Sequence, residues 1–211
     1  MIQIEHLTLA LDNRIILSNI CASFPSGQIH GLVGRNGSGK TMLMKCISGF
    51  IRPTSGNVVI DGKQMGSRSN FPENMGILIE TPGFLPYVSG LRNLIMLAEL
   101  NGNINTQDVR DTLELVGLDP NLTIPVKKYS LGMRQRLGLA QALMEKPNIL
   151  LLDEPFNGLD KDGLHQMRDF LKKYCTSSRT LLLASHSTED INTLCDTVWE
   201  MDHGVLSLKK H

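Results

Sequence analysis

Apolar and polar residues alternate along the first part of the chain, which is the pattern of strands that bury one face. The alternation predicts a β-rich stretch over residues 14–24, closed by a turn at Pro25-Ser26-Gly27, and a shorter strand over residues 28–33. Further extended segments are predicted around Ile2, Ile4, Leu7 and Leu9, at residues 57–60 and at residues 75–79.

Helical spacing replaces this alternation in two regions. Apolar residues recur at helical spacing over residues 41–50, immediately after a glycine-rich loop. From residue 82 to residue 146 the pattern is helical throughout. Ser89 and Thr106 are the predicted N-caps of two helices there, and a third helix is predicted over residues 131–144.

The strand pattern returns in the last part of the chain, with helices between the strands. These strands are predicted at residues 149–152, 180–184 and 197–201. Strand–helix alternation on both sides of a helical insert predicts an α/β fold with a mainly parallel sheet, an N-terminal antiparallel β-subdomain and an inserted α-helical subdomain. We expect a single domain, with a core of residues 1–81 and 147–211 and a helical subdomain of residues 82–146.

Composition narrows the function classes. The 211 residues contain 21 Lys plus Arg and 21 Asp plus Glu, so the formal net charge is zero. Dedicated nucleic-acid binders usually carry a basic surplus, so we expect no nucleic-acid partner. No apolar run approaches the roughly 20 residues of a membrane-spanning helix, so any membrane role must come through a partner. The four cysteines lack metal-ligand spacing, which favours reduced thiols in a cytosolic protein.

The glycine-rich loop carries the strongest chemical signal. It matches the pattern G-x-x-x-x-G-K-[ST] between a predicted strand and a predicted helix, the context that supports such a match. Glycines let backbone N–H groups point at phosphate oxygens, and the helix start adds positive potential. Lys40 would reach the β- and γ-phosphates of a nucleotide, and the Thr41 hydroxyl would bind Mg²⁺. The loop consists of Gly34, Arg35, Asn36, Gly37, Ser38, Gly39, Lys40 and Thr41.

A pair of carboxylates follows a later apolar run. Residues 149–152 are all apolar and are followed by Asp153 and Glu154. A buried parallel strand would present both carboxylates at its carboxyl end, where ligand sites of α/β folds form. Asp153 suits the Mg²⁺ shell, and Glu154 could act as general base toward the attacking water. Taken alone, this pair is weak evidence for a nucleotide site, but its position after a phosphate loop makes the evidence strong.

Three more short segments add to the phosphate loop and the carboxylate pair. Residues 129–136 read Tyr-Ser-Leu-Gly-Met-Arg-Gln-Arg, residues 157–160 read Asn-Gly-Leu-Asp, and residues 184–186 read Ala-Ser-His. Here the chain resembles the nucleotide-binding domain of ABC transporters, whose signature is LSGGQ, followed later by a D-loop and a switch histidine. The motifs occur in family order along essentially the whole chain. The resemblance implies the P-loop NTPase fold, with ATP and Mg²⁺ as cofactors.

The resemblance also implies roles for these segments. Ser130 and the Gly132 N–H, within the signature Ser130-Leu131-Gly132-Met133, would contact the γ-phosphate of ATP held by a second subunit. His186 would hydrogen-bond the γ-phosphate, and Asp160 would link the two sites across the dimer. ATP would therefore join two subunits, and its hydrolysis would release them.

Two departures from the family pattern carry information. Glu80 stands where most members have the Q-loop glutamine, and we expect it to bind Mg²⁺ or orient water, at the cost of added negative charge near the triphosphate. Leu11, or nearby Asn13, stands where an aromatic residue usually stacks on adenine. We therefore expect weaker and less base-selective binding. Glu80 and the altered signature resemble bacterial exporter ATPases for lantibiotics, bacitracin-like peptides and other drugs.

Two features of the sequence each allow two interpretations. Arg35 either adds positive potential to the loop or faces solvent. Phe84, Leu85 and Tyr87 either belong to the core of the helical subdomain or form a groove for a helix of a membrane subunit.

The resemblance implies the ATP-hydrolysing subunit of a transporter, held at the inner face of the cell membrane by a separate polytopic permease. Export is favoured, and one chain with both halves of the site permits a homodimer. The alternative is a soluble, non-transport ABC ATPase that acts as a mechanical switch.

Overall fold

The computed structural model describes residues 1–65, 72–80, 83–102 and 104–209. Within them the strands form two sheets. The first is antiparallel, in the order β2-β1-β4-β5. Its β1–β2 turn places Asp12 and Asn13 at φ 47° and 62°, as a tight two-residue hairpin requires. Its strands are β1 (Ile2–Leu11), β2 (Arg14–Phe24), β4 (Ser55–Ile60) and β5 (Lys63–Gln64).

The second sheet has six strands in the order β10-β9-β3-β8-β7-β6. All neighbouring pairs are parallel except β10 with β9, which confirms the predicted mainly parallel core. Its strands are β3 (Gln28–Val33), β6 (Met75–Leu78), β7 (Ile149–Asp153), β8 (Thr180–Ala184), β9 (Thr197–Asp202) and β10 (Val205–Lys209).

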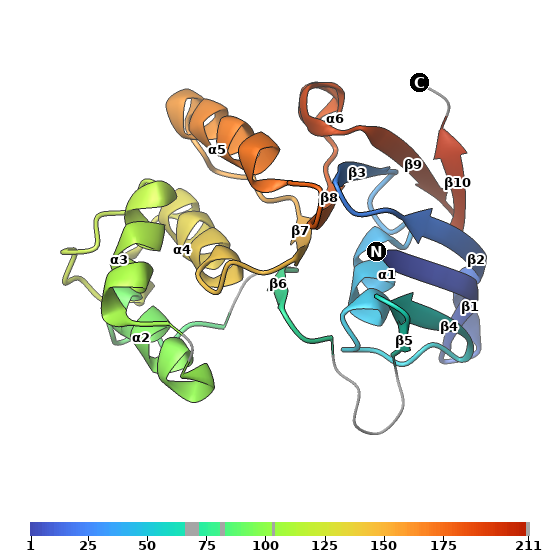
Figure 1. The fold of residues 1–211 in the computed structure, drawn as a ribbon, viewed down its shortest axis with the longest axis horizontal. Coiled ribbons are helices and arrows are strands. Elements are labelled where there is room, and N and C mark those ends of the chain that lie inside the picture. Colours follow the sequence, from blue (N-terminus) through green and yellow to red (C-terminus); the bar gives the residue numbers. More distant parts are fainter. Residues whose placement is uncertain (66–71, 81–82, 103, 210–211) are drawn as a thin grey trace.

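The helices divide between the sheets and one end of the molecule. Figure 1 shows α2, α3 and α4 grouped at one end and the four-stranded sheet with α1 at the other, with β6 and β7 between them. The helices are α1 (Lys40–Ile47), α2 (Gly90–Asn101), α3 (Thr106–Leu115), α4 (Leu131–Leu143), α5 (Lys161–Tyr174) and α6 (Thr188–Leu194), with a short 3₁₀ turn at Val126–Lys128.

Two hydrophobic cores lie on opposite faces of the parallel sheet. In β7, Leu150 and Leu152 pack into the core shared with α2–α5, whereas Ile149 and Leu151 pack into the core shared with α1 and the antiparallel sheet. Burial on both faces explains why this strand is apolar at every position before Asp153.

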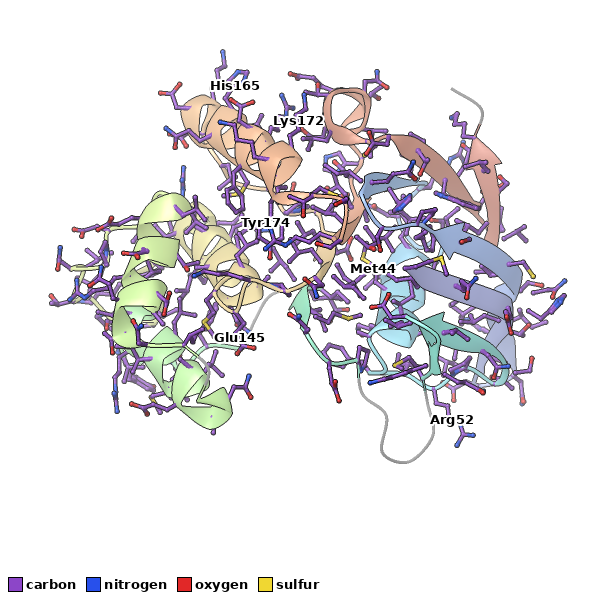
Figure 2. All side chains as sticks on the ribbon, viewed as in Figure 1. Met44, Arg52, Glu145, His165, Lys172 and Tyr174 are labelled. Carbon is purple, nitrogen blue, oxygen red and sulfur yellow. The ribbon has the colours of Figure 1, made fainter. Side chains whose placement is uncertain are left out.

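Figure 2 shows how side chains fill the space between the elements. Met44 of α1 lies in the second core, and Tyr174 at the end of α5 donates its hydroxyl to Pro147 O at 2.7 Å. All four cysteines are free, and burial raises the pKa of the Cys46 thiol to about 11, so this thiol stays protonated at neutral pH.

Several local predictions can be compared with this fold. Ser89 caps α2 by accepting a hydrogen bond from Arg92 N, as predicted. The prediction of Thr106 as a cap is wrong: Asn105 caps α3, because its side chain and that of Asp108 form a reciprocal capping box. The short strand β5 and the edge strand β10 were not anticipated. The predicted domain boundary at residues 81 and 82 lies outside the described residues.

Candidate functional site

The glycine-rich loop connects β3 to α1. Gly39 is the N-cap of α1 at φ 117°, and no side chain caps this helix start. Gly34 lies at φ 150°, where a Cβ would stand 2.2 Å from Met201 O. Only glycine fits these two positions, and the loop therefore keeps the backbone amides at the start of α1 uncovered by side chains.

Polar side chains complete this cradle. Lys40 is 7% exposed, and its Nζ donates to Gly34 O at 2.7 Å and to Arg35 O at 3.1 Å. The hydroxyl of Ser38 is buried and has no hydrogen-bond partner among the described residues. A buried hydroxyl without a partner, beside an ammonium and a helix start, fits the oxygens of a bound phosphate.

The loop meets the acidic strand through one hydrogen bond. Thr41 Oγ1 donates to Asp153 Oδ2 at 2.6 Å. Mg²⁺ is usually bound by one or two carboxylates together with waters and substrate phosphates, and these two oxygens fit that ligand chemistry. No cluster of three or more His, Cys, Asp or Glu side chains suited to a metal occurs in the part of the chain that the structure describes. Waters and substrate phosphates would supply the other ligands of a metal here.

The ends of β7 and β8 bring Glu154 and His186 together. His186 Nδ1 lies 2.7 Å from Glu154 Oε2. Glu154 has φ 48°, and its N–H donates to Ala184 O at 2.9 Å. A carboxylate and an imidazole in contact can orient a water molecule and accept its proton.

A buried network holds the segment that carries His186. The Ser185 hydroxyl donates to Asp190 Oδ2 and accepts from Ser187 N, both at 3.1 Å. Arg168 of α5 donates from Nε to Asp190 Oδ1 at 2.9 Å. Hydrogen bonds therefore hold Ser185 and Ser187 on either side of His186, while the His186 side chain itself remains 67% exposed. Sequence reasoning missed Arg168, because no local pattern marks it as the partner of Asp190.

The phosphate loop and the acidic strand share one cavity of about 340 Å³. Ile16 of β2 forms part of its wall, whereas Leu11, 42% exposed at the end of β1, does not line it. Ile16 carried no sequence signal, because it comes from the other sheet. The lining residues from the predicted motifs are Asn36, Gly37, Gly39, Lys40, Thr41, Asp153 and Glu154.

The signature segment starts α4 and does not line this cavity. Ser130 is the N-cap of α4, and its Oγ accepts from Met133 N at 3.2 Å. Leu131 is 61% exposed. A Cβ on Gly132 would lie 2.3 Å from Gly158 O, so the helix start packs against the backbone of the loop that follows Glu154.

The remaining predicted residues form ion pairs or face solvent. Glu80 Oε1 lies 2.7 Å from Lys45 Nζ, so the added negative charge is balanced by a lysine one helical turn beyond Thr41. Asp160, before α5, pairs with Arg136 Nη2 at 2.5 Å. Arg35 is exposed and lines a second cavity, of about 700 Å³, together with His186.

The geometry agrees with a comparison to known families. A family model described as ABC transporter matches residues 17–157. The chain belongs to this family. It is an ABC ATPase, which binds and hydrolyses ATP.

Three relatives show how far the similarity of this ABC ATPase extends. It is 42% identical to the uncharacterized ABC transporter ATP-binding protein YybJ of Bacillus subtilis, over 98% of this chain and 94% of the relative. It is 38% identical to the bacitracin transport ATP-binding protein BcrA of Enterococcus faecalis, over 98% of this chain and 68% of BcrA. It is 32% identical to the lantibiotic transport ATP-binding protein SrtF of Streptococcus pyogenes, over 100% of this chain and 90% of SrtF.

Solved structures confirm the fold. A bacterial ABC transporter cassette described as dimeric, MJ0796, matches with a TM-score of 0.88 at 21% identity, over 100% of this chain and 98% of that chain. The predicted P-loop NTPase fold is therefore confirmed. In the described residues of this ABC ATPase, no helix has the length and apolar character needed to cross a membrane.

Proposed function

We propose that this ABC ATPase powers an exporter for a peptide antibiotic, drug or similar compound, by dimerising around ATP beneath a separate membrane permease. The similarity to proteins named for bacitracin and lantibiotic transport supports this class of cargo. The observation that carries the proposal is the division of the site. Lys40, Thr41, Asp153 and Glu154 line one cavity, and the signature segment lies outside it.

In this proposal the phosphate loop binds the triphosphate of ATP. The Lys40 ammonium, now held by the carbonyls of Gly34 and Arg35, turns to the β- and γ-phosphates. The Ser38 hydroxyl and the backbone amides at the start of α1 donate to the remaining oxygens. Ile16 lies along the wall and would offer the base an apolar surface in place of an aromatic ring, whereas Leu11 does not line the cavity.

Hydrolysis is assigned to the residues at the ends of β7 and β8. Thr41 and Asp153 would hold Mg²⁺, which neutralises phosphate charge when bound. Glu154 accepts the proton of the attacking water, and His186, in contact with it at 2.7 Å, hydrogen-bonds the γ-phosphate. Glu80, whose carboxylate pairs with Lys45 of α1, would bind Mg²⁺ or orient the water.

A second subunit completes the site. Ser130 and the Gly132 N–H at the start of α4 would contact the γ-phosphate bound to the partner, with Leu131 and Met133 shaping that surface, and Asp160 near the boundary between the two sites. Leu131 is exposed, and residues 130–133 are not part of the cavity lining, which supports an arrangement across two chains. Loss of the γ-phosphate removes the contact and separates the subunits.

The permease is proposed to dock on a groove of about 480 Å³ between β6 and α2. Phe50 and Leu100 line it and are 62% and 80% exposed. Large exposed apolar side chains beside a groove are typical of a surface that receives an amphipathic helix. Phe84 packs against the helical core, whereas Leu85 and Tyr87 are exposed and do not line the groove. The core (1–81, 147–211) and the helical subdomain (82–146) would then meet the permease at their junction.

The decisive experiment uses Glu154→Gln, which keeps the shape of the side chain and removes the base. We expect MgATP to bind and to draw two Glu154→Gln chains into a stable dimer, measured by light scattering after size exclusion, while turnover falls by at least about 100-fold. Glu99→Gln, an exposed glutamate on α2, is the matched control and should hydrolyse ATP normally. Wild-type turnover by Glu154→Gln, or a monomer at saturating ATP, would overturn the proposal.

A second measurement separates the transporter from the soluble switch. The wild-type chain should co-purify with a polytopic permease encoded beside it, and Leu100→Glu should break that complex while leaving the ATPase activity of the isolated chain unchanged. A chain that binds no permease and hydrolyses ATP at its full rate alone would favour the soluble switch.

A further inference from the structure

Helix α4 contacts the loop after β7 at three places. Gln135 Nε2 donates to the main-chain carbonyl of Glu154 at 3.0 Å. Arg136 Nη2 pairs with Asp160 Oδ1 at 2.5 Å. The Gly132 backbone packs directly against Gly158 O. The three contacts span residues 132–136 of α4 and residues 154–160 of the loop, so the start of α4 is docked on this loop.

The contact at Glu154 falls on a residue with an unfavourable backbone. Its φ of 48° lies in the left-handed region, which residues with a Cβ avoid. Such a conformation persists only where the surroundings hold it in place. Here both peptide groups of the residue are held, because the N–H donates to Ala184 O at 2.9 Å and the carbonyl accepts from Gln135. In this conformation the carboxylate reaches His186 Nδ1 at 2.7 Å.

The other two contacts keep the segments together without Gln135. Arg136 also donates to Val116 O at 2.7 Å, and it passes between Gly117 and Gly163, where an added Cβ would lie 2.3 Å and 2.2 Å from its guanidinium nitrogens. Because Gly117 and Gly163 have no side chains, Arg136 has room to connect α4 to the end of α3 and the start of α5. Loss of the Gln135 donor would free the Glu154 carbonyl while the docking of α4 remains.

We infer that Gln135 is a positioning residue for hydrolysis: by holding the Glu154 carbonyl, it keeps the catalytic carboxylate aimed at His186 and at the attacking water. The inference rests on the proposed role of Glu154 as general base. It also extends that role, because Ser130 begins the same helix. A shift of α4 when Ser130 meets the partner's nucleotide would move Gln135, and with it the Glu154 of its own chain.

The test is Gln135→Met, which keeps the length of the side chain and removes the N–H donor. Because misplacing a reacting group by about 1 Å can cost up to about 100-fold in rate, we expect kcat to fall about 10- to 100-fold. The Kd for MgATP should stay within about twofold, since no phosphate contact is lost. Gln107→Met, an exposed position on α3, is the matched control and should leave both values unchanged.

The same change in a Glu154→Gln background distinguishes positioning from general damage. If Gln135 acts only through Glu154, the double variant should hydrolyse no more slowly than Glu154→Gln alone and should form the same ATP-dependent dimer. A wild-type kcat for Gln135→Met, or loss of the dimer in the double variant, would overturn the inference and leave the proposed function intact. Wild-type turnover by Glu154→Gln alone would instead overturn the proposed function.

Discussion

Helices α1 and α4 both begin at motifs associated with phosphate, and their first turns differ in what occupies the free N–H groups. At α1 the N-cap is Gly39, and no side chain covers the amides. At α4 the N-cap is Ser130, whose hydroxyl accepts from Met133 N. Around α1 a lysine, a threonine and two carboxylates line one cavity, whereas the start of α4 lies outside that cavity and exposes Leu131.

In the proposed function, one helix start is a complete phosphate site and the other is half of one. The left-handed glycines and the buried Lys40 prepare α1 for an anion within a single chain. At the start of α4, the Ser130 hydroxyl already accepts from one backbone N–H. The first cationic side chain of this segment is Arg134, and it donates to Tyr129 O. In the proposed function this helix start meets the phosphate of a nucleotide bound to a second chain, and the following changes test this contrast.

Lys40→Ala should have the largest effect, because it removes the buried ammonium from the complete site. Truncating one partner of a buried charge pair costs about 2–5 kcal/mol, so MgATP affinity should fall at least about 30-fold by titration calorimetry. Lys172→Ala, on an exposed face of α5, is the control. Tight binding by Lys40→Ala would place the phosphate site elsewhere.

Glycine substitutions at the two helix starts should separate binding from dimerisation. In Gly39→Ala the new Cβ would lie 2.8 Å from Leu17 Cδ2 at φ 117°, so ATP affinity itself should drop by about tenfold. In Gly132→Ala the Cβ would lie 2.3 Å from Gly158 O, which displaces the start of α4. Its ATP affinity should stay within about twofold, while ATP-dependent dimerisation and turnover fall about tenfold or more. Equal losses of affinity in both variants would remove the distinction.

Glu80→Gln should have the smallest effect on the isolated chain. The Glu80 side chain is 62% exposed, and surface ion pairs contribute about 0–1 kcal/mol, so neither the melting temperature nor nucleotide binding should change much. The expected change is in coupling, measured as cargo moved per ATP hydrolysed with the permease in vesicles. A ratio equal to that of the wild type would show that the carboxylate has no part in coupling.

The accuracy of the sequence predictions follows the distance over which each interaction acts. Ser89 was a correct cap because capping is settled within three residues. The prediction of Thr106 failed because a neighbouring side chain can also cap: Asn105 accepts from the N–H groups of Gln107 and Asp108, and its own N–H donates to the Asp108 carboxylate. Strand β10 was missed because its burial pattern is almost wholly exposed, and an edge strand depends on pairing with β9 rather than on its own apolar face.

The site residues also divide into those that a local sequence pattern predicts and those that depend on long-range packing. The phosphate loop, the apolar strand before Asp153 and Glu154, and the serine before α4 are contiguous patterns, because a tight turn, a buried strand and a helix cap each depend on neighbouring residues. The roles of Lys45 as partner of Glu80 and of Ile16 as cavity wall carry no such pattern. They follow from how separate elements pack.

The amino-acid sequence by itself determined the family, the phosphate loop and the carboxylates at the end of β7, since local spacing and strand burial restrict those residues. Only the tertiary structure decided that Glu154 meets His186, and that Gln135 reaches the Glu154 carbonyl. The physical reason is that these contacts depend on the order of strands in the sheet and on the docking of α4, and both are settled by burying apolar surface over the whole chain.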